Sequence, residues 1–223
     1  MQYADATPEG QAQVAGAIRT GHRGPRHWLE PQRAVDAFDA KADALAVLEA
    51  VGAPLENVQV SADAPGWYHP GQSGALRLGP TVLAWFGRLH PRVTEAFGIK
   101  GEAAAIEVFL DRVPSPRARG TARPALKLSP FQPVERDFAF VLDRSVPAET
   151  VLRAAKGAEK GLISDARVFD LDEGDRLEPG KKSLALTVVL QPTEATLTEE
   201  RIEAVAAKIV AAVAKATGGT LRT

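Results

Sequence analysis

The stretch SPFQPVERDFAFVL, residues 129–142, decides the fold of the second half of this chain. Prolines punctuate its start, and an Arg-Asp pair then opens a run in which apolar residues alternate with small or polar ones. Successive side chains of a strand leave opposite faces, so Phe138, Phe140 and Leu142 would share one face. The other face would carry Asp137, Ala139 and Val141. The stretch therefore predicts a strand with one apolar face.

The same alternation returns in VFDLDEGDRLEPGKKSLALTVVL, residues 168–190, which predicts a strand, a polar loop and a further strand over 183–190. The apolar side of that last strand holds Leu184, Leu186, Val188 and Leu190. Its other side holds Ser183, Ala185, Thr187 and Val189. The sheet would thus have one face apolar enough to carry two helices and one face on which something flat could lie.

Two helices are predicted to cover the apolar face. The first starts near Pro147, a residue favoured in a first helical turn, and ends around 157–161. The second has Thr198 as its N-cap, and Gly218 stops it. Its apolar stripe has the spacing of one helical face: Ile202, Val205, Ala206, Ile209 and Val213. With a closing strand at 220–222, the order of elements is that of a ferredoxin-like (βαββαβ) domain.

Residues 129–223 resemble the ferredoxin-fold anticodon-binding domain that ends the β subunit of bacterial phenylalanyl-tRNA synthetases. The matching elements are FQPVERDFAFVL, the FDLDEG…PGKKSLAL hairpin, the QPTEATLTEE helix entry and the final LR. Each element is weak alone, but the combination is specific. The resemblance implies that this domain binds tRNA(Phe).

Residues 1–112 predict an α+β domain with a mostly antiparallel sheet. A strand through Val14 to Ile18 precedes a predicted helix over 35–51, and a loop is expected at 65–74 before a hairpin. The apolar side of the helix is predicted to hold Val35, Phe38, Ala42, Leu45, Leu48 and Val51. A basic, Pro-rich linker is expected at 113–128, with Arg112 just before it.

This first half resembles the catalytic-core-like domain of the same β subunit. The segments GPRHW, YHPGQSG and GRLHP occur in the family's order, followed by a closing IEV strand. The resemblance implies a truncated class II synthetase-like antiparallel sheet domain without class II catalytic machinery. Where the family has Gly-Glu-Leu-His-Pro, Arg88 replaces the acid, which removes any role of that carboxylate. We expect Met1 to open a fragment of a longer protein.

Composition sets broad limits on function. The chain has 223 residues, 45% hydrophobic, and contains no cysteine, which excludes disulfides and cysteine nucleophiles and fits a reducing cytoplasm. No apolar run reaches the roughly 20 residues of a membrane span. The formal net charge is −1, so no overall basic field attracts nucleic acid. Residues 112–127 are locally basic, which is typical of a solvated linker and permits phosphate contacts.

Most enzyme and metal signatures are missing from the sequence. There is no GxxxxGK[ST] or GxGxxG motif, and GQSG at 71–74 fits a turn between strands. The four histidines are scattered, so no zinc site is predicted. The acidic run from Asp170 to Asp175 fails as a calcium loop, because Gly174 and Lys181 would fall at positions 5 and 12. No catalytic or metal-binding residue is predicted.

What remains is a binding surface on the second domain. The resemblance to the family supports a set of predicted tRNA-binding residues around this sheet. They are Arg136, Asp137, Arg167, Lys181, Lys182, Ser183 and Arg222. Each charge alone would equally fit a plain surface residue. Phe138 and Phe140 share the core face, so recognition would use hydrogen bonds and shape rather than aromatic stacking.

The first hypothesis is that the chain is the C-terminal portion of the β subunit. By resemblance, the whole enzyme is an α2β2 heterotetramer that attaches phenylalanine to tRNA(Phe) with ATP and magnesium, and catalysis belongs to the α subunit. This part would pack on α, bind tRNA and hold no cofactor of its own. The alternative is a stand-alone RNA- or protein-interaction module with a ferredoxin-like fold and no enzymatic activity.

Overall fold

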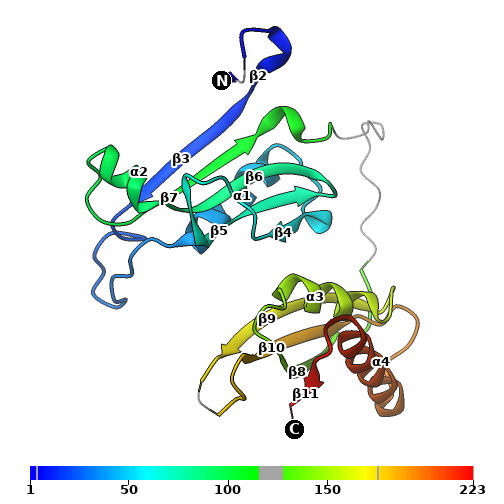
Figure 1. The fold of residues 1–223 in the computed structure, drawn as a ribbon. Helices are drawn as coiled ribbons and strands as arrows, with labels where there is room; N and C mark the ends of the chain where they lie inside the picture. Colours follow the sequence, from blue (N-terminus) through cyan, green and yellow to red (C-terminus); the bar gives the residue numbers. More distant parts are fainter. Residues whose placement is uncertain (4, 116–127, 175, 223) are drawn as a thin grey trace. The chain divides into compact units, whose positions relative to one another are not determined.

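The strand predicted from SPFQPVERDFAFVL pairs along its whole length with a neighbour in a four-stranded sheet (Figure 1). The computed structural model describes residues 1–3, 5–115, 128–174 and 176–222. The chain divides into two units, Met1–Ala122 and Arg123–Thr223. The predicted linker at 113–128 lies largely outside the described residues. Within the described ranges, no helix is long and apolar enough to cross a membrane.

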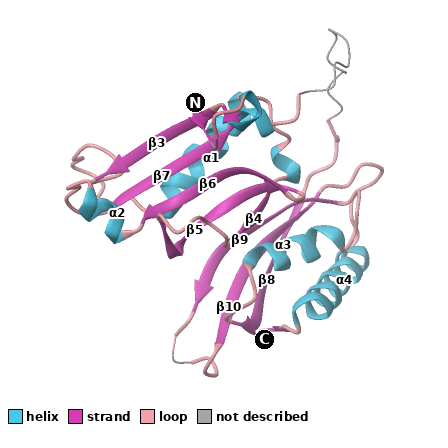
Figure 2. Cartoon of the chain, turned by 45° about the horizontal axis from the view of Figure 1, so that its top comes forward, coloured by secondary structure: helices cyan, strands magenta, loops and turns pink. Residues whose placement is uncertain are grey.

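Unit 2 has the ferredoxin-like arrangement that the sequence predicts. Its strands pair antiparallel in the order β11-β8-β10-β9, and helices α3 and α4 pack on one face of this sheet (Figure 2). The elements are β8 (Val134–Asp143), α3 (Ala148–Gly157), β9 (Ile163–Asp172), β10 (Lys181–Leu190), α4 (Glu199–Thr217) and β11 (Thr220–Leu221).

The core of unit 2 lies between that sheet and the two helices. Phe140 and Leu186 are 0% exposed and Phe138 is 8% exposed, so the predicted apolar face is confirmed. Fully burying such a side chain contributes roughly 1.5–3 kcal/mol. Helices α3 and α4 contribute six buried side chains to this core: Val151, Ala155, Ile202, Val205, Ile209 and Val213. The predicted stripe of α4 is therefore the buried one, although Ala206 is only partly buried.

The ends of α4 are set by the predicted residues. The Thr198 hydroxyl accepts a hydrogen bond from the backbone N–H of Arg201 at 3.3 Å, which satisfies one free donor of the first turn. At the other end Gly218 has φ 69°, a left-handed conformation that a residue with a Cβ adopts only at a cost. The Thr198 hydrogen bond and the Gly218 backbone conformation set the two ends of α4, so that the helix has the length that covers the sheet.

Unit 1 is built on a five-stranded antiparallel sheet in the order β3-β7-β6-β5-β4, with α1 packed on one face. Its helices and strands are β1 (Gln2–Tyr3), η1 (Pro8–Gly10), β2 (Gln11–Ala12), β3 (Val14–Thr20), α1 (Ala37–Ala50), η2 (Leu55–Asn57), β4 (Gln59–Ser61), β5 (Tyr68–Leu78), β6 (Thr81–Leu89), α2 (Pro91–Ala96), β7 (Ala103–Phe109) and η3 (Leu110–Arg112).

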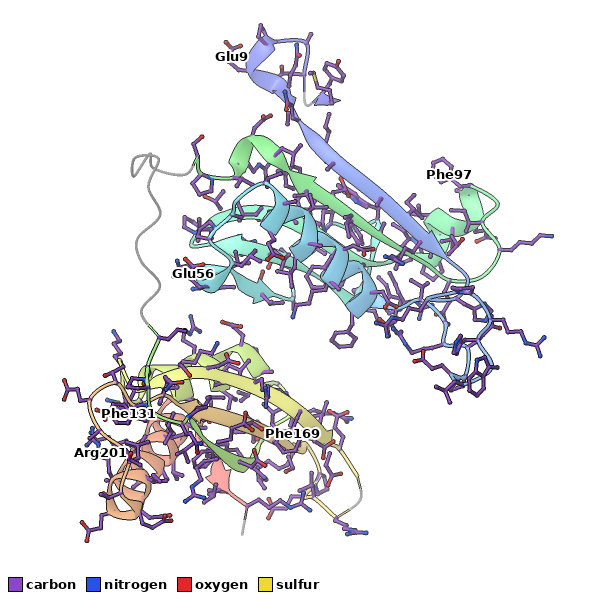
Figure 3. The ribbon with its side chains drawn as sticks, turned by 180° about the vertical axis from the view of Figure 1, so that it is seen from behind. Glu9, Glu56, Phe97, Phe131, Phe169 and Arg201 are labelled. Carbon is purple, nitrogen blue, oxygen red and sulfur yellow. The ribbon has the colours of Figure 1, made fainter. Side chains whose placement is uncertain are left out.

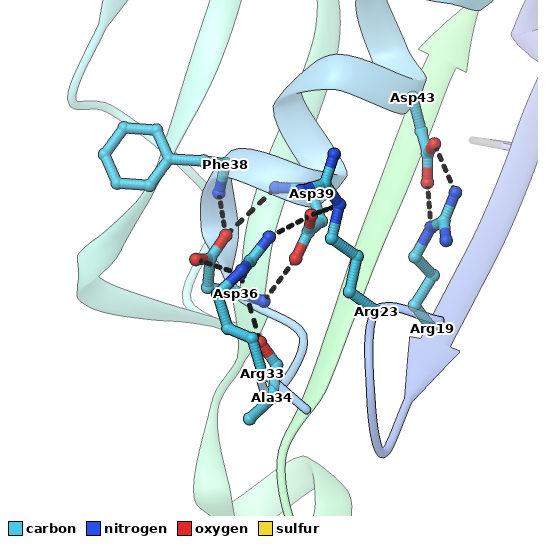
Figure 4. A network of polar contacts seen from close by, with 8 residues as sticks. All are labelled: Arg19, Arg23, Arg33, Ala34, Asp36, Phe38, Asp39 and Asp43. Carbon is cyan, nitrogen blue, oxygen red and sulfur yellow. Dashed lines mark hydrogen bonds and ion pairs between the residues drawn. The ribbon is translucent and has the colours of Figure 1, made fainter. Parts of the chain in front are cut away.

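The buried face of α1 agrees only in part with the predicted one. Val35 and Leu48 are buried as predicted and Leu45 is partly buried, but the other three predicted residues, Phe38, Ala42 and Val51, are exposed. Ala40, Ala44 and Leu48 face the sheet, whereas Phe38 is 76% exposed. The small alanine side chains let the helix lie close to the sheet. Because alanine is only weakly hydrophobic, these residues do not mark the buried face in the sequence. A capping box fixes the start of α1: the Asp36 carboxylate accepts from two backbone N–H groups, and the Asp39 carboxylate accepts from the N–H of Asp36 (Figure 4).

Arginines neutralise these acids at the start of α1. The Arg33 guanidinium contacts both Asp36, at 2.6 Å, and Asp39, at 2.7 Å. The hydrogen bond from Arg33 holds the pKa of Asp39 below its usual range. Arg19 of β3 pairs with Asp43 one turn further along the helix (Figure 4). The network ties the helix to the strand beneath it.

The predicted loop at 65–74 is wrong for most of its length, because β5 begins at Tyr68. The pairing of β5 with β6 shifts register between Tyr68 and Ser73, and this irregularity absorbs the Pro-Gly pair. Opposite it, Gly87 has φ 139°, and a Cβ there would lie 2.4 Å from the Cα of Ser73. Only glycine fits at that crossing. The GQSG segment is thus part of a strand and not a turn.

Candidate nucleic-acid interface

The sheet face of unit 2 that points away from α3 and α4 is called the open face below. At its centre Ala185 of β10 pairs with Ala139 of β8 and with Asp170 of β9. These small side chains leave a shallow surface between taller polar groups at its margins. The residues that point to this face include Asp137, Ala139, Val141, Arg167, Asp170, Asp172, Lys181, Ser183, Ala185, Thr187, Val189 and Arg222.

An ion pair crosses the open face. The backbone N–H of Arg222 donates to the carbonyl of Ala139 at 2.7 Å, which continues the β11 pairing by one residue. The Arg222 guanidinium contacts Asp172 on β9 at 3.1 Å. Because β8 and β10 lie between β11 and β9, the two side chains must reach over both strands. Ser183 on β10, opposite Asp172, is only 3% exposed although no helix covers this face.

Asp172 is held as a carboxylate by its surroundings. A hydrogen bond from the backbone N–H of Gly174, at 2.9 Å, is the main cause that lowers its pKa, and the contact with Arg222 adds to it. The side chain therefore presents acceptor oxygens to anything on the open face. Arg222 presents donors beside it.

Two further cations stand at the margins of the open face. Arg167 on β9 contacts Glu135 on β8 at 3.1 Å, and Lys181 at the start of β10 contacts Asp143 at 2.7 Å. The hydrogen bond with Asp143 raises the pKa of Lys181. Exposed ion pairs of this kind are weak, so each cation can exchange its carboxylate for a phosphate. Arg167, Lys181 and Arg222 thus frame the face.

A hydrogen bond from a hydroxyl to a carboxylate lies between these cations. The Thr187 hydroxyl donates to the Asp137 carboxylate at 2.7 Å across paired strands. Thr187 is buried, at 6% exposed, whereas Asp137 is exposed. The pair keeps the floor of the open face polar and fixes the direction of the carboxylate.

Two predicted residues lie elsewhere. Arg136 shares the parity of Phe138 and pairs with Glu199 at the start of α4, at 2.9 Å. The Lys182 ammonium donates to the carbonyl oxygens of Arg144, at 3.0 Å, and Val146, at 2.6 Å. Both side chains therefore belong to the helix-bearing side of the sheet, and Lys182 holds the turn before α3. The other five predicted residues share the open face.

The sequence prediction missed residues that the fold brings to this surface. Asp172 was considered only as part of a calcium loop, yet it pairs with Arg222; its alternation with Asp170 along β9 was the available signal. Phe169 is 58% exposed at the register shift of β9 (Figure 3). Among the described residues, no group of three or more histidines or acids could hold a metal ion.

Comparison with known proteins assigns both halves. Residues 129–222 match the family model of the ferredoxin-fold anticodon binding domain, and residues 3–110 match the model of the phenylalanyl tRNA synthetase beta chain CLM domain. The fold and the matched domain define an anticodon-binding module of the aminoacyl-tRNA synthetase class. Because the two models together cover most of the chain, the chain belongs to the family of phenylalanyl-tRNA synthetase β subunits.

Named relatives agree with this assignment. The chain is 55% identical over 222 residues to the phenylalanine–tRNA ligase beta subunit of Paramagnetospirillum magneticum. The aligned region covers 99% of this chain and 28% of that protein. The chain is 57% identical over 215 residues to the corresponding subunit of Ruegeria pomeroyi, covering 96% and 27%. The chain therefore spans little more than a quarter of the length of these relatives.

Proposed function

We propose that this chain acts as part of the β subunit of a phenylalanine–tRNA ligase and that unit 2 binds tRNA(Phe) through its open face. The observation that carries the proposal is the set of cations Arg167, Lys181 and Arg222 around a floor of small side chains. Phosphates would replace the carboxylate partners of these cations, while a base would lie on the floor and exchange hydrogen bonds with Asp137 or Asp172.

Unit 1 serves a structural role in this proposal. We infer a truncated class II synthetase-like domain without catalytic residues, which packs on the catalytic α subunit of an α2β2 heterotetramer in the cytoplasm. The whole enzyme would use ATP and magnesium, held outside this chain. Ligase activity from the purified chain without α would contradict this division of roles. Co-purification with α, followed by a mass measurement of the complex, tests the assembly.

A filter-binding titration of the chain with tRNA(Phe) tests the RNA contact. The variants Arg167→Ala and Lys181→Ala should each weaken RNA binding whatever the RNA sequence. Each should also reduce the slope of log affinity against log salt by about 1. Lys182→Ala is unsuitable because that side chain holds two backbone carbonyls.

Arg201→Ala is the matched control. Arg201 also carries one positive charge and one carboxylate partner, Glu159 at 3.1 Å, but it lies on α4. It should leave both affinity and salt slope unchanged. Equal effects of all three variants would indicate unspecific charge attraction. Binding that is absent or independent of salt would favour the alternative, a protein-interaction module. The similarity to β subunits over nearly the whole chain does not favour that alternative.

A further inference from the structure

Unit 1 contains an apolar hollow that the proposed tRNA contact does not use. It lies on the sheet face opposite α1, between β3, β7, the start of β5 and helix α2, and measures about 650 Å³. That volume is in the range of small-molecule sites, roughly 300–1,000 Å³. Ile18 and Phe97 stand at its rim, 62% and 79% exposed, and Figure 3 shows Phe97 projecting outward beside α2.

One charged group lines this hollow. Glu107 of β7 is half-buried, and its Oε1 atom accepts from the Trp67 indole N–H at 2.8 Å and from the Tyr68 hydroxyl at 3.1 Å. Both donors are neutral. Within the part of the chain that the structure describes, no lysine, arginine or histidine side chain pairs with this carboxylate. Its negative charge is thus oriented by two donors but not neutralised.

The aromatic rings around Glu107 also favour a cation. Tyr68 is 2% exposed, and its burial, together with the charge of Glu107, raises its pKa, so the phenol stays protonated and donates. Tyr68 and Phe97 are the aromatic residues that line the hollow, whereas Trp67 contacts Glu107 through its indole N–H and does not belong to the lining. Aromatic faces attract an ammonium group, and a carboxylate adds a charge-assisted hydrogen bond.

We propose that this hollow binds a small organic ammonium ion, with its apolar body among the side chains of Ile18, Val93 and Phe97 and its ammonium group on Glu107. The lining offers no basic side chain. An amine therefore finds a partner here, whereas the carboxylate of a free amino acid would be desolvated without one. The site should select amines over amino acids and over carboxylic acids.

The test uses the full chain and four probes with the same phenyl body: 2-phenylethylamine, L-phenylalanine, 2-phenylethanol and phenylacetate. We expect saturable binding of 2-phenylethylamine by calorimetry, with a dissociation constant on the order of 1 mM or tighter. The other three should bind at least about tenfold more weakly. Added salt should weaken only the amine. Equal binding of amine and alcohol, or no saturable binding of the amine, would overturn the proposal.

Variants locate the site. Glu107→Gln keeps an oxygen that accepts from Trp67 and Tyr68 but removes the charge, so the amine should lose its advantage over 2-phenylethanol. Glu49→Gln makes the same chemical change on α1, across the sheet, and should bind the amine normally. Should Glu107→Gln fail to fold in a thermal scan, Phe97→Ala, at an exposed rim position, replaces it and should weaken amine binding several-fold. Unchanged binding in the folded variant places the amine elsewhere and refutes the proposal.

Discussion

Neighbouring residues of β10 give a test of the two faces of the unit 2 sheet. Leu186 is 0% exposed beneath the helices, and Ala185 faces the other way, opposite Ala139. Replacing Leu186 by Ala removes buried atoms and leaves a cavity, which costs about 2–5 kcal/mol. For a domain of this size each kcal/mol lowers the melting temperature by about 4–8 °C, so a drop of at least about 8 °C is expected.

The reverse change at the adjacent residue should act on binding instead. Ala185→Leu adds three carbons to a surface that no helix covers, so the stability should change by less than about 1 kcal/mol. The new side chain would occupy the floor on which a base is proposed to lie. We expect affinity for tRNA(Phe) to fall at least tenfold, which corresponds to about 1.4 kcal/mol.

Both variants are followed by circular dichroism melting and by filter binding at low and moderate salt. Leu186→Ala should melt early, yet bind with an affinity within about threefold of the parent at a temperature where it is folded. Ala185→Leu should melt normally and bind poorly. If Ala185→Leu binds like the parent, the open face is not the tRNA surface; if Leu186→Ala alone weakens binding in the folded state, the assignment of faces is wrong.

Three other outcomes are expected, all measured by thermal or urea denaturation of unit 1. Gly87→Ala should cost about 1–3 kcal/mol, because φ is 139° and the new Cβ would meet Ser73. Phe38→Ser should change stability by less than about 0.5 kcal/mol, since this ring is exposed. The pKa of Asp39 is lowered by Arg33, so its contribution is complete above the unfolded pKa of about 3.9 and disappears as pH falls through the lower folded pKa. Melting temperature should fall less below pH 4 in Asp39→Asn than in the parent.

The fold of unit 2 could be predicted because its signals are local. Alternation along β8 and β10 records which side chains leave water, and Thr198 and Gly218 mark helix ends through their own hydrogen bonding and backbone conformation. The buried residues of unit 1 were harder to predict from the sequence. On α1 the buried residues are mostly alanines, which fit the close approach to the sheet but resemble neutral positions in a sequence.

The sequence by itself determined the order of the elements, the parity of the core strands and the family resemblance. Only the tertiary structure decided which charges meet. Arg136 and Asp137 are neighbours in the chain, yet one pairs with Glu199 on α4 and the other bonds Thr187 on the open face. Arg222 and Asp172 lie 50 residues apart and meet across two strands. Periodicity is a property of neighbouring residues, whereas the partner of a charge depends on how distant strands are ordered in the sheet.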